Sequence, residues 1–483
     1  MSSDVRSKRE LAFVFGLCAL ACAKSTPSVS FSSPGDGERF FGSRDVTVQG
    51  SIGESRNIVS VVALQNGTPL DVTWSQTRFE FVASLDDNNN VFEVTAANKD
   101  GVSGSATLSL EFPFVTLTTF QAASKVIGQA DFTSVNVGVS QARTAVVNGD
   151  PEFADGVFYV PDYENSRVLA FGGVPDANGA SAEFVLGQPN FTASAPGTSA
   201  VTMDGPQTVQ AHEGRLYVAD YGNSRVLIWN ALPKSTQVPA NIVVGQYDFN
   251  TLDETCSANR LSGAESVFVI GQRLLVSDSL NNRVLIWNSL PTTSGGSADV
   301  VIGQSDFVHC AANDDDQDDS EDFGPTARTL SYPIGLWSDG QRLFVADAFN
   351  NRVLAWNAIP TANFQAADSV FGQPDMLTNL EGTTQFRFDL PSAVHSNGNQ
   401  LFVADSGNRR ILVWNTFPPA TLGAEVVIGQ GDFFHGALND DNQDGLPDLG
   451  PTARTLAEPS GLTFIGDTLW VADRFNRRYI GFR

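Results

Sequence analysis

Two acidic stretches of the chain hold carboxylates at a spacing that suits a metal ion. "HGALNDDNQDGLPDLGPTARTL" covers residues 435–456, and its near copy "HCAANDDDQDDSEDFGPTARTL" covers residues 309–330. Calcium prefers closely spaced carboxylate and carbonyl oxygens, on a loop that a glycine allows to bend. The candidate ligands are Asp440, Asn442, Asp444 and Asp448 in the later copy, and Asp314, Asp316, Asp318 and Asp322 in the earlier one.

The later copy reads D-x-N-x-D-G-x-x-D and is similar to EF-hand-like and thrombospondin-type calcium loops. Pro451 stands at the twelfth position, where an EF-hand has its bidentate glutamate, so other groups would have to complete the ligand set. In the earlier copy Asp319 replaces the glycine. The sequence therefore leaves calcium and a solvated acidic loop open at 440–448, with calcium slightly ahead. It favours the solvated loop at 314–322.

The N-terminus is typical of an exported protein. Basic residues in the first ten positions precede the apolar run "LAFVFGLCALA", which is too short to span a bilayer but suits the core of a signal peptide. The run ends in "ALAC", which resembles the lipobox of bacterial lipoproteins, although Ala19 stands where leucine is usual. We expect a lipoprotein-type signal peptide over 1–21, a lipid-modified Cys22, a tether over 22–26, and a membrane-anchored location in the bacterial envelope.

The charge of the chain limits its partners. Asp and Glu number 54 against 29 Lys and Arg, which gives a formal net charge of −25. Such a chain repels phosphate backbones and anionic lipid surfaces, so nucleic acid is excluded as a main partner. Acidity at this level favours solubility, cation binding or basic partners.

The cysteines and histidines predict a disulfide and no catalytic centre. Apart from the two cysteines near the N-terminus the chain has only Cys256 and Cys310, and two cysteines in an exported protein indicate a disulfide. The four histidines form no H-x-x-H motif, and there is no G-x-S-x-G or glycine-rich phosphate loop. We therefore assign no catalytic residue, and an enzyme remains an alternative only.

From residue 125 onward the chain repeats itself with a basic period of ~58 residues. One element is "VIGQADF" and its variants, and the other is "LYVADYGNSRVLIWN" and its variants, each with the motif D-x-x-N-x-R. The six sets are Asp162, Asn165, Arg167; Asp220, Asn223, Arg225; Asp278, Asn281, Arg283; Asp347, Asn350, Arg352; Asp405, Asn408, Arg410; and Asp473, Asn476, Arg478. The motif lies between two apolar runs, which predicts strand, tight turn, strand. Because a residue needed for local geometry recurs in every repeat, we expect these sets to be structural.

"LYVADYGNSRVLIW" closely resembles the NHL repeat, and six copies imply a six-bladed β-propeller over residues 124–483. The chain stops after the third strand of its last repeat, whereas an additional "VIGQ" at 126–129 precedes the first blade. We therefore expect this N-terminal segment to be the outer strand of the last blade and to close the ring. The turns that carry D-x-x-N-x-R and both acidic inserts are then expected on one face.

Residues 27–113 show short runs of alternating apolar and polar residues, separated by turns such as Asn66-Gly67. The stretch resembles bacterial immunoglobulin-like domains, which implies a small β-sandwich. We expect residues 114–123 to be a linker. The chain is thus expected to be all-β, with a small Ig-like β-sandwich followed by the six-bladed propeller.

The function that we expect is binding. We expect an exported, lipid-anchored binding or scaffold protein whose propeller face recognises a protein, peptide or glycan. One alternative is a lyase or lactonase-like propeller enzyme with a channel metal, and another is a structural envelope protein stabilised by calcium. Binding and catalysis would be separated by whether unrepeated His, Asp or Glu residues converge at the channel mouth.

Overall fold

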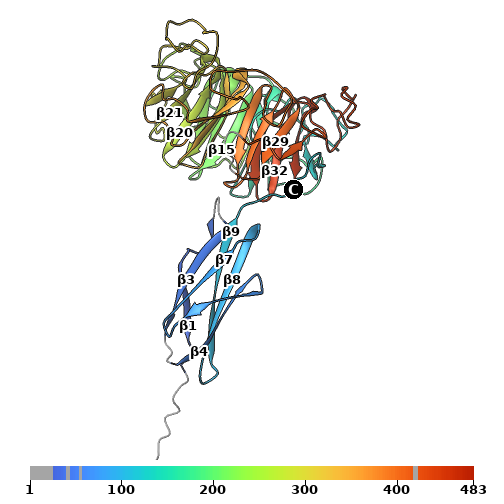
Figure 1. Cartoon of the computed structure of the whole chain (residues 1–483). Helices are drawn as coiled ribbons and strands as arrows, with labels where there is room; N and C mark the ends of the chain where they lie inside the picture. The colour runs from blue at the N-terminus through green and yellow to red at the C-terminus, as the bar shows by residue number, and fades with distance from the viewer. Residues whose placement is uncertain (1–24, 40–43, 54–56, 417–421) are drawn as a thin grey trace, which may run out of the picture. The chain divides into compact units, whose positions relative to one another are not determined.

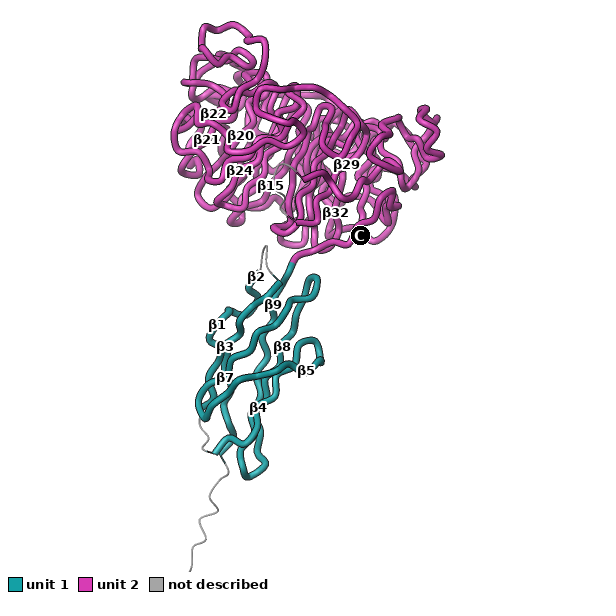
Figure 2. Tube along the Cα trace, in the orientation of Figure 1, with its two compact units in different colours: residues 1–112 teal, residues 113–483 magenta. Residues whose placement is uncertain are grey.

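The computed structural model describes residues 25–39, 44–53, 57–416 and 422–483. The chain divides into two compact units, one ending at Phe112 and one beginning at Pro113 (Figure 2). The expected signal peptide and Cys22 lie outside the described residues. Within the described part, no helix has the length and apolarity that crossing a membrane would require.

The first unit is a β-sandwich of two sheets. Their strand orders are β1-β3-β7-β6 and β2-β9-β8-β4-β5. The strands are β1 (Ser28–Ser33), β2 (Glu38–Arg39), β3 (Asp45–Gly53), β4 (Ile58–Gln65), β5 (Thr68–Leu70), β6 (Thr73–Trp74), β7 (Arg78–Ser84), β8 (Asn88–Asn98) and β9 (Ser103–Phe112). Alternate residues of β3 and β7, such as Val48 and Phe81, are buried between the sheets, as a period of two requires.

The second unit contains six four-stranded antiparallel sheets, the blades of a propeller (Figure 1). The first three are β11 (Glu152–Ala154), β12 (Val157–Asp162), β13 (Arg167–Phe171), β14 (Phe184–Leu186); β15 (Pro206–His212), β16 (Arg215–Asp220), β17 (Arg225–Trp229), β18 (Ile242–Val244); and β19 (Ala264–Ile270), β20 (Arg273–Asp278), β21 (Arg283–Trp287), β22 (Val300–Ile302). The last three are β23 (Pro333–Ser338), β24 (Leu343–Asp347), β25 (Arg352–Trp356), β26 (Ser369–Phe371); β27 (Pro391–Ser396), β28 (Leu401–Asp405), β29 (Arg410–Trp414), β30 (Val426–Ile428); and β31 (Pro459–Ile465), β32 (Thr468–Asp473), β33 (Arg478–Phe482), β10 (Lys125–Ile127).

The ring closes through the N-terminal strand, as the sequence predicts. Strand β10 pairs antiparallel with β33, with Lys125 opposite Gly481, so the last blade is built from both ends of the propeller sequence. Each innermost strand contacts the innermost strand of the next blade, and β31 contacts β11. This arrangement confirms the all-β propeller closed by an N-terminal outer strand, and it leaves no blade with a missing outer edge.

The segment before β10 packs on the propeller. The backbone N–H of Val115 donates to Gln400 Oε1 at 2.8 Å, and Gln400 Nε2 donates back to the carbonyl of Val115 at 2.9 Å. Further along, the N–H of Ala123 donates to the carbonyl of Ala453 at 2.7 Å. Leu117 is buried in the hydrophobic core of the last two blades. Most of the stretch expected to be a linker is therefore held by the propeller.

The D-x-x-N-x-R residues build a buried network in every blade. In the second blade Asp220 Oδ2 accepts hydrogen bonds from Asn223 Nδ2 at 2.9 Å and from Arg225 Nε at 2.7 Å. Arg225 also donates to the carbonyl of Ser199, on the loop that leads into this blade, and to that of Phe249, on the loop that leads out of it. All six aspartates and all six arginines of the motif are fully buried. The network fixes each tight turn and anchors the long loop that leads to the next blade.

Candidate functional site

A cavity of about 340 Å³ lies on the propeller face that carries the D-x-x-N-x-R turns. The residue directly after the motif's aspartate reaches this cavity in five of the six turns. These residues are Tyr163, Tyr221, Ala348, Ser406 and Arg474. Four of them belong to one-turn 3₁₀ elements, namely η1 (Tyr163–Asn165), η2 (Tyr221–Asn223), η4 (Ala348–Asn350) and η5 (Arg474–Asn476). The same turns thus bury their repeated residues and place the next residue, which varies among the blades, at the channel.

The innermost strands supply the floor of the cavity. The second residue of each of five innermost strands lines it, and these residues are Gln207, Glu265, Ile334, Ser392 and Ser460. In the first blade Asn148 takes part instead, and its Nδ2 donates to Gln207 Oε1 at 2.6 Å. Because these residues differ from blade to blade, the floor is chemically asymmetric although the ring that carries it is not.

The residue before each innermost strand shapes the rim. Gly205 and Gly263 occupy this position with positive φ angles, and a Cβ at Gly205 would come within 2.7 Å of the Tyr163 ring. The glycine therefore makes room for the tyrosine. In the next two blades Tyr332 and Leu390 adopt the same left-handed conformation, with φ of 54° and 51°. Large side chains are uncommon in that region of φ, and here the conformation turns both residues toward the cavity that they line.

A chain of hydrogen bonds leads from the cavity to a buried carboxylate. The hydroxyl of Tyr332 donates to Glu265 Oε1 at 2.8 Å, and the hydroxyl of Tyr221 lies 3.2 Å from that of Tyr332. Glu265 also forms a side-chain hydrogen bond with Gln207. Burial raises the pKa of Glu265 to about 7, despite these hydrogen bonds, so the group exchanges its proton near neutral pH.

Aromatic rings form part of the cavity wall. Tyr332 stacks on Phe349 with ring centroids 4.7 Å apart and an interplanar angle of 13°. Tyr163 and Tyr221 lie next to each other with centroids 6.3 Å apart. Phe349 is 56% exposed, so its ring is available to a ligand. These rings give the cavity apolar surface beside its polar floor.

Two polar atoms at the cavity have no hydrogen-bond partner among the described residues. They are Ser460 Oγ and Arg474 Nε, and both belong to the last blade. Ser460 is only 6% exposed, so its hydroxyl is enclosed by protein. Arg474 uses its Nη1 to donate to Glu458 Oε1 at 2.6 Å, which leaves the Nε–H for another acceptor. Buried polar atoms are rarely left unpaired, and an unpaired one requires an explanation.

Two further carboxylates lie at the first blade's innermost strand. Asp150 accepts a hydrogen bond from the backbone N–H of Leu462 at 2.7 Å, and Glu152 accepts one from Ala211 at 3.2 Å. Burial raises the pKa of each to about 7. In the next blade Gln210 occupies the position of Glu152 and both accepts from and donates to the backbone of Val269. Glu152 can reproduce the donating bond only when it is protonated.

The histidines lie apart from one another and from this cavity. His395 is enclosed by Trp337 and Phe464, and burial lowers its pKa to about 4. His212 bonds to the carbonyl of Gly271, while His309 bonds to a neighbouring aspartate at the start of its insert. None of the four lines the channel-mouth cavity.

The two acidic inserts share one hydrogen-bond pattern. Asp314 and Asp440 are fully buried, and each accepts two backbone N–H groups from the residues four and five positions later. In the earlier insert, oxygens of Asp314, Asp316 and Asp322 lie within 4.8 Å of one another, and this is the one such group of three carboxylates, histidines or cysteines within the described residues. The later insert has Asn442 in place of Asp316.

The grouping of carboxylates is the reverse of the order that the sequence favoured. The carboxylates converge in the insert for which a solvated loop was expected, where mutual repulsion, led by Asp318, raises the pKa of Asp316. Asp318 and Asp444 each accept the backbone N–H two residues ahead and so form Asx turns. Calcium binding at either insert stays a prediction.

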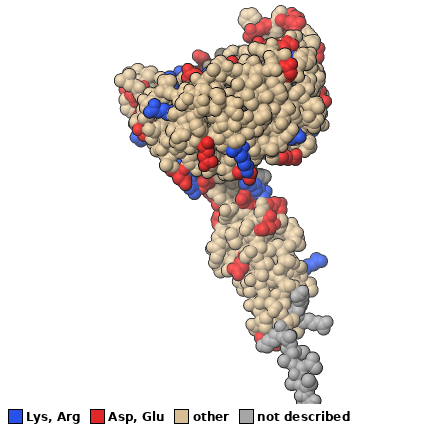
Figure 3. Space-filling model, turned by 180° about the vertical axis from the view of Figure 1, so that it is seen from behind, with Lys and Arg blue, Asp and Glu red and all other residues tan. Residues whose placement is uncertain are grey.

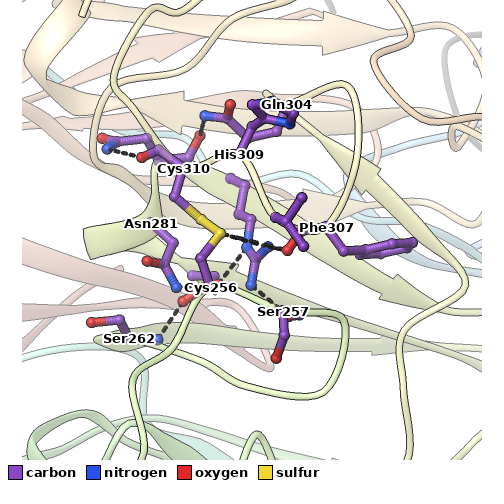
Figure 4. The surroundings of a disulfide bond; sticks show 12 residues. Cys256, Ser257, Ser262, Asn281, Gln304, Phe307, His309 and Cys310 are labelled. Atoms are coloured by element: carbon purple, nitrogen blue, oxygen red, sulfur yellow. Dashed lines mark hydrogen bonds and ion pairs between the residues drawn. A yellow bond between two sulfur atoms is a disulfide. The ribbon is translucent and has the colours of Figure 1, made fainter. Parts of the chain in front are cut away.

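A disulfide links the loops of the third and fourth blades. Figure 4 shows Cys256 bonded to Cys310, next to the carbonyls of Ser257 and Phe307. Both carbonyls accept hydrogen bonds from Arg283, the motif arginine of the third blade. The covalent bond therefore reinforces a loop that the repeated network already anchors.

Charge is dispersed on the face of the propeller that Figure 3 draws. On this face acidic and basic groups are separated by wide neutral areas, with acidic groups gathered near the upper edge. The carboxylates do not form one continuous acidic patch there.

Comparison with known proteins supports no assignment of function. No protein-family model matches the chain, and no curated protein sequence matches it. Similar solved structures include a "Putative phosphatase" from Bacteroides thetaiotaomicron, with 12% identity, a TM-score of 0.41, and coverage of 94% of this chain and 96% of that chain. The PQQ-bound aldose sugar dehydrogenase from Streptomyces coelicolor shows 13% identity, a TM-score of 0.35, and coverage of 72% and 97%. The glutaminyl cyclase from Myxococcus xanthus shows 10% identity, a TM-score of 0.30, and coverage of 59% and 93%. Similarity this low carries no functional argument.

Proposed function

We propose that this chain is an exported binding protein whose propeller takes its ligand in the channel-mouth cavity. Under this proposal the repeats are of the NHL type, the first unit is an Ig-like spacer, and a lipid on Cys22 holds the protein in the envelope. The ligand is a protein, a peptide or a glycan that presents a small group to the cavity. The inserts at 309–330 and 435–456 are on this view secondary to the cavity, whether or not they bind calcium.

The observation that carries the proposal is the set of unrepeated polar residues at the cavity. Residues that serve the blades recur six times and have their hydrogen bonds satisfied inside the blades, as Asp220 and Arg225 do. The cavity residues do not recur through all six blades, although tyrosine stands at both 163 and 221 and serine at both 392 and 460. Ser460 Oγ and Arg474 Nε have no protein partner there. A ligand that supplies the missing partners would recover the cost of leaving these atoms unpaired.

Capture from envelope extract tests this proposal. The full chain is immobilised as wild type, as Arg474→Ala and as Leu377→Ser, a matched control because Leu377 is 68% exposed and does not line the cavity. We expect the same molecule to be retained by wild type and by Leu377→Ser and lost with Arg474→Ala. Equal retention by all three proteins would contradict the proposal.

One observation favours an enzyme as the second candidate. Glu265 is a buried carboxylate with a pKa of about 7, bonded to Tyr332 at the cavity. Such a group can accept and return a proton near neutral pH, as general acid–base catalysis requires. Glu265→Gln separates the two functions, since it preserves the shape of the cavity. A binding protein keeps its ligand in this variant, whereas an enzyme of this kind keeps binding and loses turnover.

A further inference from the structure

We infer that the group bound in the channel-mouth cavity is a neutral saccharide ring. This inference rests on the proposed function, because it names the chemical class of ligand for the same cavity. Four features of the cavity lead to it: its free donors, its paired charges, its aromatic wall and its size.

The free polar atoms of the cavity are donors. Arg474 Nε–H can only donate, and Ser460 Oγ can donate or accept. Both atoms come from the last blade and line the cavity together. They therefore suit a ligand with more than one oxygen acceptor, such as the hydroxyl groups of a ring.

The charged groups at the cavity largely offset one another within the protein. Glu458 pairs with Arg474 at 2.6 Å. Asp389 and Arg409 carry opposite charges and both line the cavity, where burial and then Glu381 outweigh Arg409 and raise the pKa of Asp389. Glu265 accepts the hydroxyl of Tyr332 at 2.8 Å, and burial raises its pKa to about 7, so its carboxyl is neutral in a large share of molecules at neutral pH. An anionic ligand would approach a chain of net charge −25. This arrangement favours a neutral ligand.

The aromatic wall suits one apolar face of a saccharide. A pyranose ring presents C–H groups on its faces and hydroxyls at its edge, so it can contact Tyr163 or Phe349 with a face and the floor with its edge. Each hydroxyl both donates and accepts, which matches the mixture of Ser460, Glu265 and Asn148. A purely apolar ligand would leave this floor unpaired.

The volume limits the ligand to a small group. About 340 Å³ is near the lower end of small-molecule sites, which run from roughly 300 to 1,000 Å³. One or two saccharide rings fit this space, and the rest of a longer glycan would extend from the mouth over the rim at Leu390, which is 42% exposed.

The test is titration calorimetry of the full chain with defined probes. The neutral probes are glucose, galactose, N-acetylglucosamine and cellobiose, and the charged probes are glucuronate and glucosamine. The variants are Ser460→Ala, Tyr163→Ala and the control Leu377→Ser, each checked for an unchanged melting temperature. We expect at least one neutral probe to bind, about 3- to 10-fold more weakly to Ser460→Ala, as the loss of one hydrogen bond predicts, and equally to Leu377→Ser.

The other outcomes overturn the inference in distinguishable ways. Tighter binding of glucuronate or glucosamine than of every neutral probe would exclude a neutral ligand. If a neutral probe binds equally well to wild type, Ser460→Ala and Tyr163→Ala, the saccharide site lies outside the cavity and the inference is wrong. If no saccharide binds but capture from extract still depends on Arg474, the saccharide class is wrong and the proposed function stands. If neither occurs, both are wrong.

Discussion

Asp220 and Tyr221 are neighbours in the chain, yet their side chains belong to different parts of the molecule. Asp220 is fully buried and bonded to Arg225, as its counterparts are in the other five blades. Tyr221 is half-buried, lines the channel mouth and bonds to Tyr332 from a blade two positions along the ring. The difference shows that neighbouring residues of one turn have different roles. Repeated side chains build the ring, and unrepeated ones give its mouth an asymmetric chemistry.

The largest effect is expected from breaking a repeated pair. Arg225→Ala leaves the Asp220 carboxylate buried without its cation and releases the loop at Phe249, so we expect a loss of about 3–5 kcal/mol in the free energy of unfolding. Tyr221→Phe, in the same turn, removes one hydroxyl and is expected to cost about 0.5–1.5 kcal/mol. Denaturant unfolding of both variants measures the difference, and equal losses would remove the distinction drawn between the two residues.

The disulfide allows a second comparison, between the stability that an unrepeated covalent bond contributes and the stability that the repeated network contributes. Cys256→Ser/Cys310→Ser removes the covalent bond but keeps the hydrogen bonds of Arg283 to Phe307 and Ser257. We expect a loss of about 2–4 kcal/mol, less than for Arg225→Ala. Unfolding with and without a reductant provides the control, because the reductant should destabilise the wild type and leave the double variant unaffected. A loss above that of Arg225→Ala would show that the disulfide, more than the network, holds these loops.

Glu152 and Gln210 occupy the same position in adjacent blades, but only Glu152 can titrate and make the stability depend on pH. The pKa of Glu152 is raised from 4.5 to about 7, first by burial, so the folded state favours the protonated form. The resulting stabilisation is complete below pH 4.5 and is lost as the pH rises through about 7. Glu152→Gln should remove this part of the pH dependence and stabilise the protein by about 1 kcal/mol at pH 8, as one recovered hydrogen bond predicts.

Melting temperatures of wild type and Glu152→Gln between pH 5 and 9 measure this effect. Asp150 faces the same region, and its pKa is also about 7. Its titration is present in both wild type and Glu152→Gln. The difference between the two curves isolates Glu152. If the curves run parallel across the range, Glu152 does not need its proton in the folded state.

The smallest effects are expected at the acidic inserts. Their candidate ligands differ in residue type at one position only, Asp316 in the earlier insert and Asn442 in the later one. Two reciprocal substitutions exchange these residues. Asp316→Asn makes the earlier insert like the later one, and Asn442→Asp does the converse. If calcium binds where three carboxylates converge, Asp316→Asn abolishes the calcium-dependent rise in melting temperature and Asn442→Asp increases it, each change below about 1 kcal/mol at millimolar calcium. No response to calcium in any of the three proteins would support the solvated loop at both sites.

The ring could be predicted because its determinants recur. D-x-x-N-x-R and the element "VIGQADF" with its variants are each visible six times, and the position of the additional "VIGQ" at 126–129 is enough to predict the pairing of β10 with β33. The cavity could not be predicted in the same way, because Tyr163, Glu265 and Arg474 come from different blades and share no motif. The sequence marks Tyr163 and Arg474 only as a variable position after the motif aspartate. That this position faces the channel follows from the geometry of the ring.

Two other differences arise from contacts that the sequence pattern does not reveal. The run of Val115 and Leu117 was short enough to be taken for a linker, and its burial depends on contacts with Gln400 and the last blades, far along the chain. At the inserts, spacing alone gave both copies the same ligands. The convergence of Asp314, Asp316 and Asp322 depends on how the backbone folds around the buried Asp314.

The pairing of β10 with β33 also has a mechanical consequence. Tension applied to the chain before Val115 is borne first by the hydrogen bonds of Val115 to Gln400 in the fifth blade, and it reaches β10 and β33 only after those bonds yield. The last blade, which presents Ser460 and Arg474 to the cavity, is therefore protected from pulling on the N-terminal side until the anchor at Gln400 gives way.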